Sequence, residues 1–289
     1  MTDDPNQNPK RVALVIGSGS VKCAAAIGLQ NVLHREGIAL DLVVGCSGGS
    51  LYAACMALGY DAPTIADMTR RLWTREITRR RSYSAWLRIL LPGVFGFDET
   101  FGLLDDRLVM ERLRAAFGET TFAQAKTPLY VAATDFMTGD QVVLSRGRLV
   151  DALRASIAMP YIFKPQRVNG QLLVDGYLSD PLPVGIAIKE GANVIVAMGF
   201  ESPYQSRITS LPRFSFQISS IMTNNLFKAN FAFHTLAHHS EVIPVVPEFH
   251  ERIRLFDTDK IPYIIEEGER AMEAQLPYLH RLLEATTAR

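Results

Sequence analysis

A serine between two glycines, in the stretch Asp41-Leu-Val-Val-Gly-Cys-Ser-Gly-Gly-Ser50, has the G-x-S-x-G spacing of a nucleophile elbow. Such an elbow is a sharp strand-to-helix turn that projects the hydroxyl of Ser47 clear of a sheet, and Gly45 and Gly49 would relieve crowding around it. The helix that follows would direct the positive end of its dipole at an oxyanion. The alternative is a glycine-rich turn in which Ser47 caps the helix. Either reading is compatible with the motif alone.

A second glycine-rich turn, Gly17-Ser-Gly-Ser-Val-Lys-Cys-Ala24, follows the first predicted strand and opens a helix. Backbone N–H groups of such a turn bind anions. Neither a P-loop nor a G-x-G-x-x-G motif is present, because Cys23 and Ala24 follow Lys22, which argues against a nucleotide. If the neighbouring strands are parallel, the turn lies beside Ser47, and its N–H groups form an oxyanion hole.

A carboxylate occupies a third turn, Val174-Asp-Gly-Tyr-Leu-Ser-Asp-Pro-Leu-Pro183, again after a predicted strand. Asp175 could bond only its own backbone, as turn aspartates often do. In an open α/β sheet, however, the turns at the carboxyl ends of the strands gather at one edge. We therefore expect Asp175 to lie near Ser47, where a carboxylate shielded from water can act as the serine's base.

The histidines bear on whether a third residue takes part. A Ser-His-acid triad of the α/β-hydrolase type needs a histidine after the serine and the acid. His234, His238 and His239 follow Asp175, but they belong to a predicted helix at 214–240 rather than to a loop after a strand. We therefore favour a serine activated by a carboxylate alone and keep the histidine triad as the alternative.

The elements that position these motifs follow from hydrophobic periodicity. Apolar and β-branched runs predict strands at 11–16, 41–44, 129–134, 141–144, 172–174, 193–198 and 242–246. Helical periodicity predicts helices at 22–36, 47–58, 214–240 and 262–286, with 61–127 mostly helical. Strands and helices alternate at the start of the chain, which indicates a parallel α/β sheet. No repeat or linker is visible, so one domain is expected.

Composition narrows the function classes. The chain has 289 residues and is 48% hydrophobic, and its 30 basic residues balance 30 acidic ones, so it lacks the basic surplus that nucleic-acid binding needs. Three cysteines without metal or disulfide spacing predict reduced thiols, and we expect no metal and no cofactor. The polar N-terminus and the lack of a long apolar run favour a cytoplasmic protein.

Taken together, the motifs resemble the patatin-like phospholipase family. The similar stretches are the glycine-rich loop at 17–23, the elbow at 45–49, the strand-turn at 133–139, the segment at 155–165 and the Asp-Gly motif at 174–183. They follow the family's order from about residue 11 to residue 200, and the order makes the likeness far more specific than any one motif.

The resemblance implies a patatin-type modified α/β-hydrolase-like fold, with a central, mostly parallel sheet flanked by helices. It implies a catalytic core at 11–200 with a helical insertion at about 61–127, and a mainly helical part of the same domain at 201–289. It also implies a lipid acyl hydrolase with a catalytic dyad, in which Ser47 is the nucleophile and Asp175, followed by Gly176, is the base.

The resemblance further assigns the glycine-rich loop to oxyanion and substrate binding. Its residues are Gly17, Ser18, Gly19, Ser20, Val21 and Lys22, with the amides of Gly19 to Val21 on the oxyanion and Lys22 where the family usually has arginine. Serines replace two of the family's glycines and Cys23 replaces a third, so a positive φ at Ser20 or Cys23 would strain the loop. An acyltransferase or thioesterase, and a catalytically silent lipid-binding protein, therefore stay open as alternatives.

Two segments could contact a lipid surface. The segment 79–97 joins an arginine cluster to Trp86 and an apolar run, which suits peripheral contact with an anionic membrane. A packed insertion over the sheet explains it equally well. For the apolar segment 214–233 we expect a role in the core or in a homodimer rather than at a membrane. The expected partners are thus a lipid or acyl-ester substrate, a membrane surface and a second copy of the chain.

Overall fold

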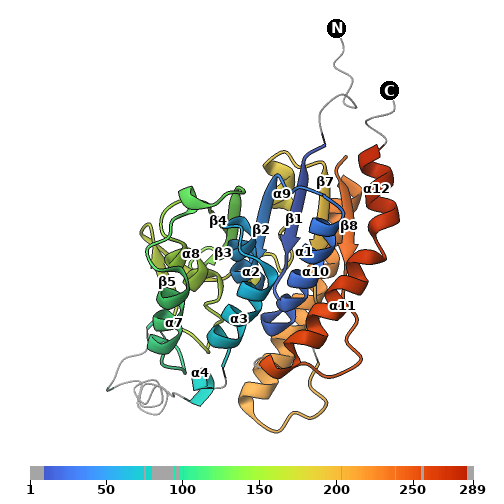
Figure 1. The fold of residues 1–289 in the computed structure, drawn as a ribbon. Coiled ribbons are helices and arrows are strands. Elements are labelled where there is room, and N and C mark those ends of the chain that lie inside the picture. The colour runs from blue at the N-terminus through green and yellow to red at the C-terminus, as the bar shows by residue number, and fades with distance from the viewer. Residues whose placement is uncertain are drawn as a thin grey trace.

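A computed structural model describes residues 10–74, 76–79, 94, 98–99, 101–202, 204–237, 239–254 and 257–284. Its strands are β1 (Val12–Ile16), β2 (Leu42–Cys46), β3 (Leu129–Asp135), β4 (Gln141–Leu144), β5 (Gln166–Val168), β6 (Gln171–Asp175), β7 (Val194–Met198) and β8 (Glu241–Val245). They form one eight-stranded sheet in the order β5-β6-β3-β2-β1-β7-β8, with β4 paired to β3 (Figure 1).

The centre of the sheet is parallel and one side of it is antiparallel. Strands β3, β2, β1, β7 and β8 pair in parallel. Strands β4 and β6 run antiparallel to β3, and β5 runs antiparallel to β6. The predicted fold class, a mostly parallel central sheet flanked by helices, is confirmed.

Helices cover both faces of the sheet. They are α1 (Ala25–Arg35), α2 (Gly48–Ala57), α3 (Ala62–Leu72), α4 (Glu76–Arg79), α7 (Arg107–Phe117), α8 (Leu149–Ser156), α9 (Val184–Lys189), α10 (Leu211–Ala237), α11 (Ile261–Glu273) and α12 (Leu276–Glu284). Short 3₁₀ turns occupy Ser20–Ala24, Phe122–Gln124, Gly176–Leu178 and Thr258–Lys260. Helices α1, α2 and α11 lie on one face of the sheet, and α9 lies on the other with α10 packed beside it (Figure 1).

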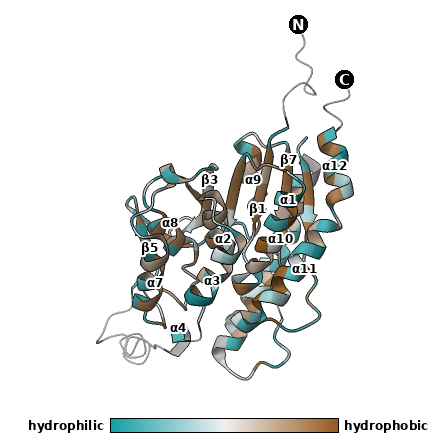
Figure 2. Cartoon of the chain, viewed as in Figure 1, coloured by the Kyte–Doolittle hydropathy of each residue, from teal (hydrophilic) through white to brown (hydrophobic). Residues whose placement is uncertain are grey.

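Each face of the sheet has its own core because side chains alternate along a strand. Leu14 and Ile16 of β1 pack in the larger core with α1 and α2, whereas Ala13 and Val15 pack in the smaller core with α9. Strands buried on both faces read as continuous apolar runs, which is why β1 and β7 are hydrophobic along their length (Figure 2).

Helices α1 and α11 cross at two glycines, one on each helix. A side chain at Gly28 would bring its Cβ within 2.1 Å of the Ile265 carbonyl oxygen, and one at Gly268 would come within 2.0 Å of the Ala25 carbonyl oxygen. The two backbones therefore touch directly, and any larger residue at either position would force the helices apart.

Several details differ from the sequence-based expectations, among them helices α8 and α9, which were not predicted. The helix predicted at 262–286 is two helices, because Pro277 at the second position of α12 lacks the N–H that would continue α11. The three-residue strand β5 was not predicted.

Of the segment 79–97, only Arg79 and Val94 are among the described residues. No helix in the described part of the chain combines the length and the apolar character needed to cross a membrane.

Candidate active site

Ser47 forms the turn between β2 and α2. Its backbone has φ 54° and ψ −129°, a conformation that costs energy for any residue with a side chain. Ser47 is the N-cap residue of α2, but its hydroxyl makes no capping bond to the helix, so the side chain does not serve as a cap. The strained turn instead directs the hydroxyl into a cavity.

Glycine is required on both sides of this turn. A Cβ at Gly45 would lie 2.4 Å from the Cα of Ser50, and one at Gly49 would lie 2.4 Å from the carbonyl oxygen of Ile16. The G-x-S-x-G spacing thus reflects backbone packed on backbone, with α2 pressed against the end of β1.

The hydroxyl of Ser47 donates a hydrogen bond to Oδ2 of Asp175 at 2.7 Å. Both residues are buried, and the other carboxylate oxygen of Asp175 accepts from the backbone N–H of Tyr177 at 3.1 Å. Burial raises the pKa of Asp175 to about 7, against the opposing effect of these two hydrogen bonds. The carboxyl group therefore titrates near neutral pH, as a general base acting there should.

The route that brings Asp175 to Ser47 differs from the predicted one. Strand β6 runs antiparallel to β3, so its carboxyl end does not point in the same direction as the carboxyl end of β2. The register brings them together instead: Cys46 is opposite Ala132, and Asp175 is opposite Ala133. The two side chains thus reach each other across β3, and a Cβ at Gly176 would lie 2.6 Å from the Ala132 carbonyl oxygen.

Two further side chains, which the sequence analysis did not single out, hold this pair in place. The hydroxyl of Ser156 donates to the Ala132 carbonyl at 2.7 Å and accepts from the Ser47 N–H at 2.9 Å. Thr134 donates its hydroxyl to the Asp175 carbonyl at 3.0 Å. Ser156 lies within the segment 155–165 that resembles the family, and this resemblance is the feature of the sequence that could have pointed to Ser156.

The glycine-rich loop lies beside the elbow, as the parallel pairing of β1 with β2 requires. A Cβ at Gly48 would lie 2.8 Å from both the nitrogen and the Cα of Ser20. Ser20 has a φ of 55°, so the strain anticipated at this serine is present, whereas Cys23 does not have a positive φ. The Sγ of Cys23 donates to the Gly17 carbonyl at 3.4 Å.

The residues assigned to this loop have different surroundings. The cavity is lined by Ser18, Gly19, Ser20, Val21 and Lys22 but not by Gly17, whose N–H donates to Met198. The N–H of Ser18 donates to the Pro181 carbonyl at 2.8 Å.

The ammonium of Lys22 has partners outside the Ser47–Asp175 pair. It donates to the Glu201 carbonyl at 3.1 Å and lies 5.8 Å from the centre of the Phe249 ring. Burial lowers the pKa of Lys22.

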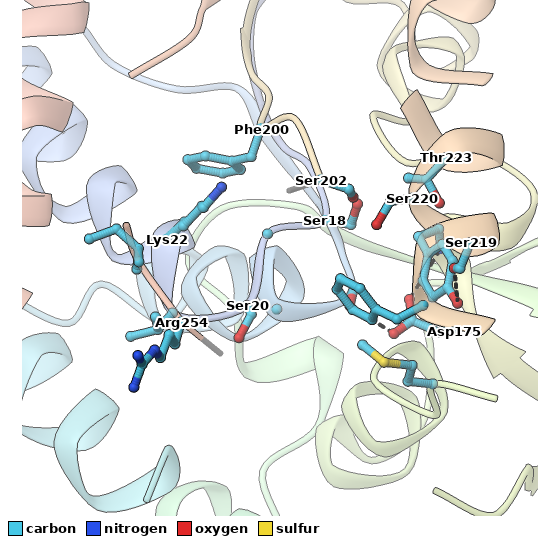
Figure 3. Close-up of a pocket in the computed structure, with 18 of the residues that line it drawn as sticks. Ser18, Ser20, Lys22, Asp175, Phe200, Ser202, Ser219, Ser220, Thr223 and Arg254 are labelled. Carbon is cyan, nitrogen blue, oxygen red and sulfur yellow. Dashed lines mark hydrogen bonds between the residues drawn. The ribbon is translucent and has the colours of Figure 1, made fainter. Parts of the chain in front are cut away.

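The cavity has a volume of about 270 Å³ and a mostly apolar wall. Its apolar lining comprises Val21, Trp73, Ile157, Met159, Ile162, Phe163, Phe200, Phe216 and Ile253. Helix α10 adds three hydroxyl side chains, Ser219, Ser220 and Thr223, on the side across from Ser18 and Ser20 (Figure 3). Such a space suits an apolar chain that ends in a polar group.

No histidine of the described chain lines this cavity. The ring of His234 lies against Gly185 of α9, where a Cβ would approach it to 2.9 Å, and His239 is exposed. His238 lies outside the described residues. Within the part of the chain that the structure describes, no cluster of acidic, histidine and cysteine side chains could hold a metal ion.

Comparison with known proteins identifies the family. A family model of the patatin-like phospholipases matches residues 14–188. The chain belongs to this family. The match begins within β1 and covers the glycine-rich loop, the elbow and Asp175, as the sequence resemblance indicated.

Among the similar proteins, an uncharacterized NTE family protein of Mycobacterium bovis is 31% identical over 188 residues, 65% of this chain and 48% of the relative. Neuropathy target esterase sws of Drosophila melanogaster is 25% identical over 203 residues, 69% of this chain and 13% of that protein. The chain thus spans about half the length or less of these relatives. The crystal structure of VipD from Legionella pneumophila matches the fold with a TM-score of 0.52 at 13% identity, over 93% of this chain and 67% of that one.

Proposed function

We propose that this protein is a serine acyl hydrolase that acts on lipids or related acyl esters, with Ser47 as nucleophile and Asp175 as base. The observation that carries the proposal is the 2.7 Å hydrogen bond from the Ser47 hydroxyl to the Asp175 carboxylate at the wall of an apolar cavity. Membership of the patatin-like phospholipase family supports the same class of reaction.

In the first half-reaction, the Asp175 carboxylate takes the Ser47 proton while Oγ attacks the ester carbonyl carbon. The tetrahedral intermediate then collapses, the bond to the alcohol breaks, and Asp175 returns the proton to the departing alcohol. An acyl group remains on Oγ. In the second half, Asp175 deprotonates water, hydroxide attacks the acyl carbon, and the proton goes back to Ser47 as the carboxylic acid leaves.

The negative charge on the intermediate is stabilised by backbone N–H groups of the turn from Gly19 to Val21. Gly48, the residue after the nucleophile, lines the same cavity and is a second source of such a group. Helix α2 begins at Gly48, so the positive end of its dipole also faces the developing charge. The bend at Ser20 and the lack of a side chain at Gly48 let the two backbones approach closely.

Labelling with a fluorophosphonate probe, which reacts with an activated serine, tests the proposal. The wild-type protein should be labelled and should hydrolyse a soluble fatty-acyl ester, and Ser47→Ala should lose both properties. Ser145→Ala, in the loop after β4 and outside the cavity, is the matched control and should keep both.

Labelling or hydrolysis that survives in Ser47→Ala would refute the nucleophile assignment. A wild-type protein that binds lipid but is neither labelled nor active would instead be the silent lipid-binding protein. Transfer of the acyl group to added glycerol in preference to water would make it an acyltransferase.

A further inference from the structure

Helix α10 has an inverted distribution of polar and apolar side chains. The side chains that face the cavity include three hydroxyls, Ser219, Ser220 and Thr223. Four large apolar side chains on the opposite side of the helix are exposed, and we call them the outer face: Phe214, Ile218, Ile221 and Met222. Phe227 and Phe231 pack against the smaller core. The expected role of segment 214–233 in the core is therefore wrong for the outer face, and the expected alternative, a homodimer contact, stays a prediction.

The outer face is one continuous stripe. Residues 214, 218, 221 and 222 are spaced so that successive members lie one turn or one position apart on the same side of an α-helix. The side chain of Phe214 is 51% exposed and that of Met222 is 65% exposed. Single exposed apolar residues are ordinary, but a contiguous stripe marks a surface that meets something apolar.

The charges around the outer face indicate what that partner is. The sequence has no Asp or Glu from Ser202 to Ser240, but it has Arg207, Arg213 and Lys228. All three basic residues are exposed, but Lys228 forms an ion pair at 3.6 Å with Glu201, just before this stretch, so the surplus rests on Arg207 and Arg213. The chain as a whole is neutral, so this local surplus of positive charge is a property of the α10 region. Apolar side chains with basic residues beside them complement a lipid layer with anionic headgroups.

We propose that the outer face of α10 docks on the surface of an anionic lipid layer. The helix would lie in the headgroup region with Phe214, Ile218 and Met222 directed at the acyl chains. Because the same helix forms one wall of the cavity, docking would bring the cavity to the layer that holds the substrate. Only this last consequence rests on the proposed hydrolase function; the docking itself does not.

Flotation of the full chain with lipid vesicles tests the docking. The wild-type protein should bind vesicles of phosphatidylcholine with phosphatidylglycerol more tightly than vesicles of phosphatidylcholine alone. The triple variant Phe214→Ser, Ile218→Ser, Met222→Ser should bind the anionic vesicles at least about tenfold more weakly, given the transfer free energy of three apolar side chains. Met137→Ser is the control, since Met137 is 73% exposed in the turn after β3.

Two further measurements separate this proposal from the proposed function. The triple variant should hydrolyse a soluble ester at the wild-type rate, because none of its three residues lines the cavity. Conversely, Ser47→Ala should bind vesicles like the wild type. If the triple variant unfolds, the single variants Met222→Ser and Met137→Ser are compared instead. Met222→Ser should bind anionic vesicles more weakly than Met137→Ser does.

Three results would overturn the docking proposal. The first is a wild-type protein that floats with neither kind of vesicle, and the second is a triple variant that binds anionic vesicles as well as the wild type does. The third is a wild-type dimer in light scattering that the triple variant converts to a monomer. That result would assign the outer face to a second copy of the chain.

Discussion

The cavity beside Ser47 has two walls that are built in different ways. On one side, the loop after β1 and the elbow after β2 place backbone directly on backbone, with Gly48 against Ser20 and Gly49 against Ile16. On the other side, α10 contributes only side chains, and its far side is exposed. The first wall has no room for an added methyl group, whereas the second can change its side chains without moving a backbone.

The difference separates chemistry from access. A nucleophile, a base and an oxyanion site must be held to within fractions of an ångström, which close backbone packing achieves. A wall that admits the substrate has no such requirement. The family match at 14–188 includes the whole first wall and ends before α10 begins at Leu211. We therefore expect large effects from changes in the first wall and small effects from changes in the second.

Replacing Asp175 by asparagine should have the largest effect. The asparagine side chain keeps the size of the aspartate but cannot accept the Ser47 proton, so turnover of a soluble ester should fall about 10³-fold or more. The Michaelis constant should change little, because the cavity keeps its shape. Steady-state kinetics measures both, and circular dichroism checks the fold. Turnover within a few-fold of the wild type would show that another group takes the proton.

One substitution to alanine in each wall compares them directly. Gly49→Ala would place a Cβ 2.4 Å from the Ile16 carbonyl oxygen. We expect the free energy of unfolding to fall by about 3 kcal/mol through overpacking. Ser219→Ala on α10 removes only the contact with the Tyr177 hydroxyl at 3.2 Å. Its cost should stay within about 1 kcal/mol. Equal losses in chemical denaturation would show that the walls do not differ in rigidity.

The pH dependence of activity should reflect the buried carboxyl of the first wall. Because burial raises the pKa of Asp175 to about 7, the base is protonated below neutral pH. We expect kcat/KM to fall about tenfold for each pH unit below that value and to level off above it. A profile that stays flat down to about pH 5 would contradict the assignment of Asp175 as the base.

Stability should change with pH in the opposite sense. An unfolded aspartate titrates near 3.9, so the folded protein binds the proton more tightly and loses stability as the pH rises from about 4 to about 7. Asp175→Asn lacks this loss and should unfold at a higher temperature than the wild type at about pH 8. Thermal unfolding of the wild type and of Asp175→Asn, at about pH 4 and at about pH 8, measures this difference in stability.

The smallest expected effect concerns the two serines of the glycine-rich loop. At Ser20, φ is 55°, and glycine would relieve a cost of about 1–2 kcal/mol at the expense of about 0.5–1 kcal/mol of chain entropy. Ser20→Gly should therefore stabilise the fold by about 0.5 kcal/mol. Ser18 does not have a positive φ, so Ser18→Gly should destabilise it by a similar amount. The denaturant midpoints of the two variants measure both changes. If both midpoints shift in the same direction, the positive φ at Ser20 does not strain the loop.

Local patterns were sufficient for the elements that carry the nucleophile. The apolar runs before Gly17 and Gly45 predicted β1 and β2, and the parallel pairing of these strands placed the loop beside the elbow. Strand β5 was missed because three partly exposed residues carry no periodicity. Pro277 was visible in the sequence, but the apolar pattern continues across it, which is why 262–286 was predicted as one helix.

The position of the base depended on information that the sequence does not display. Strand direction and register are set by pairing between segments far apart in the chain, so nothing near Asp175 indicates that β6 runs antiparallel to β3. The role of Ser156 could not be predicted for the same reason, because its hydrogen-bond partners Ala132 and Ser47 lie 24 and 109 residues away in the chain. Motif order brought Asp175 into consideration despite a wrong assumption about the strand that carries it.

The glycine crossing of α1 and α11 has a consequence for dividing the chain. Helix α1 follows the glycine-rich loop, and its partner Gly268 lies 80 residues beyond the end of the family match at 188. Strand β7 also lies beyond 188, yet it pairs with β1 along its whole length. A fragment cut at residue 188 would therefore carry both members of the Ser47–Asp175 pair but would leave β1 with an open edge and α1 without its neighbour. The smallest piece able to hold the loop in place is longer than the segment by which the family is identified.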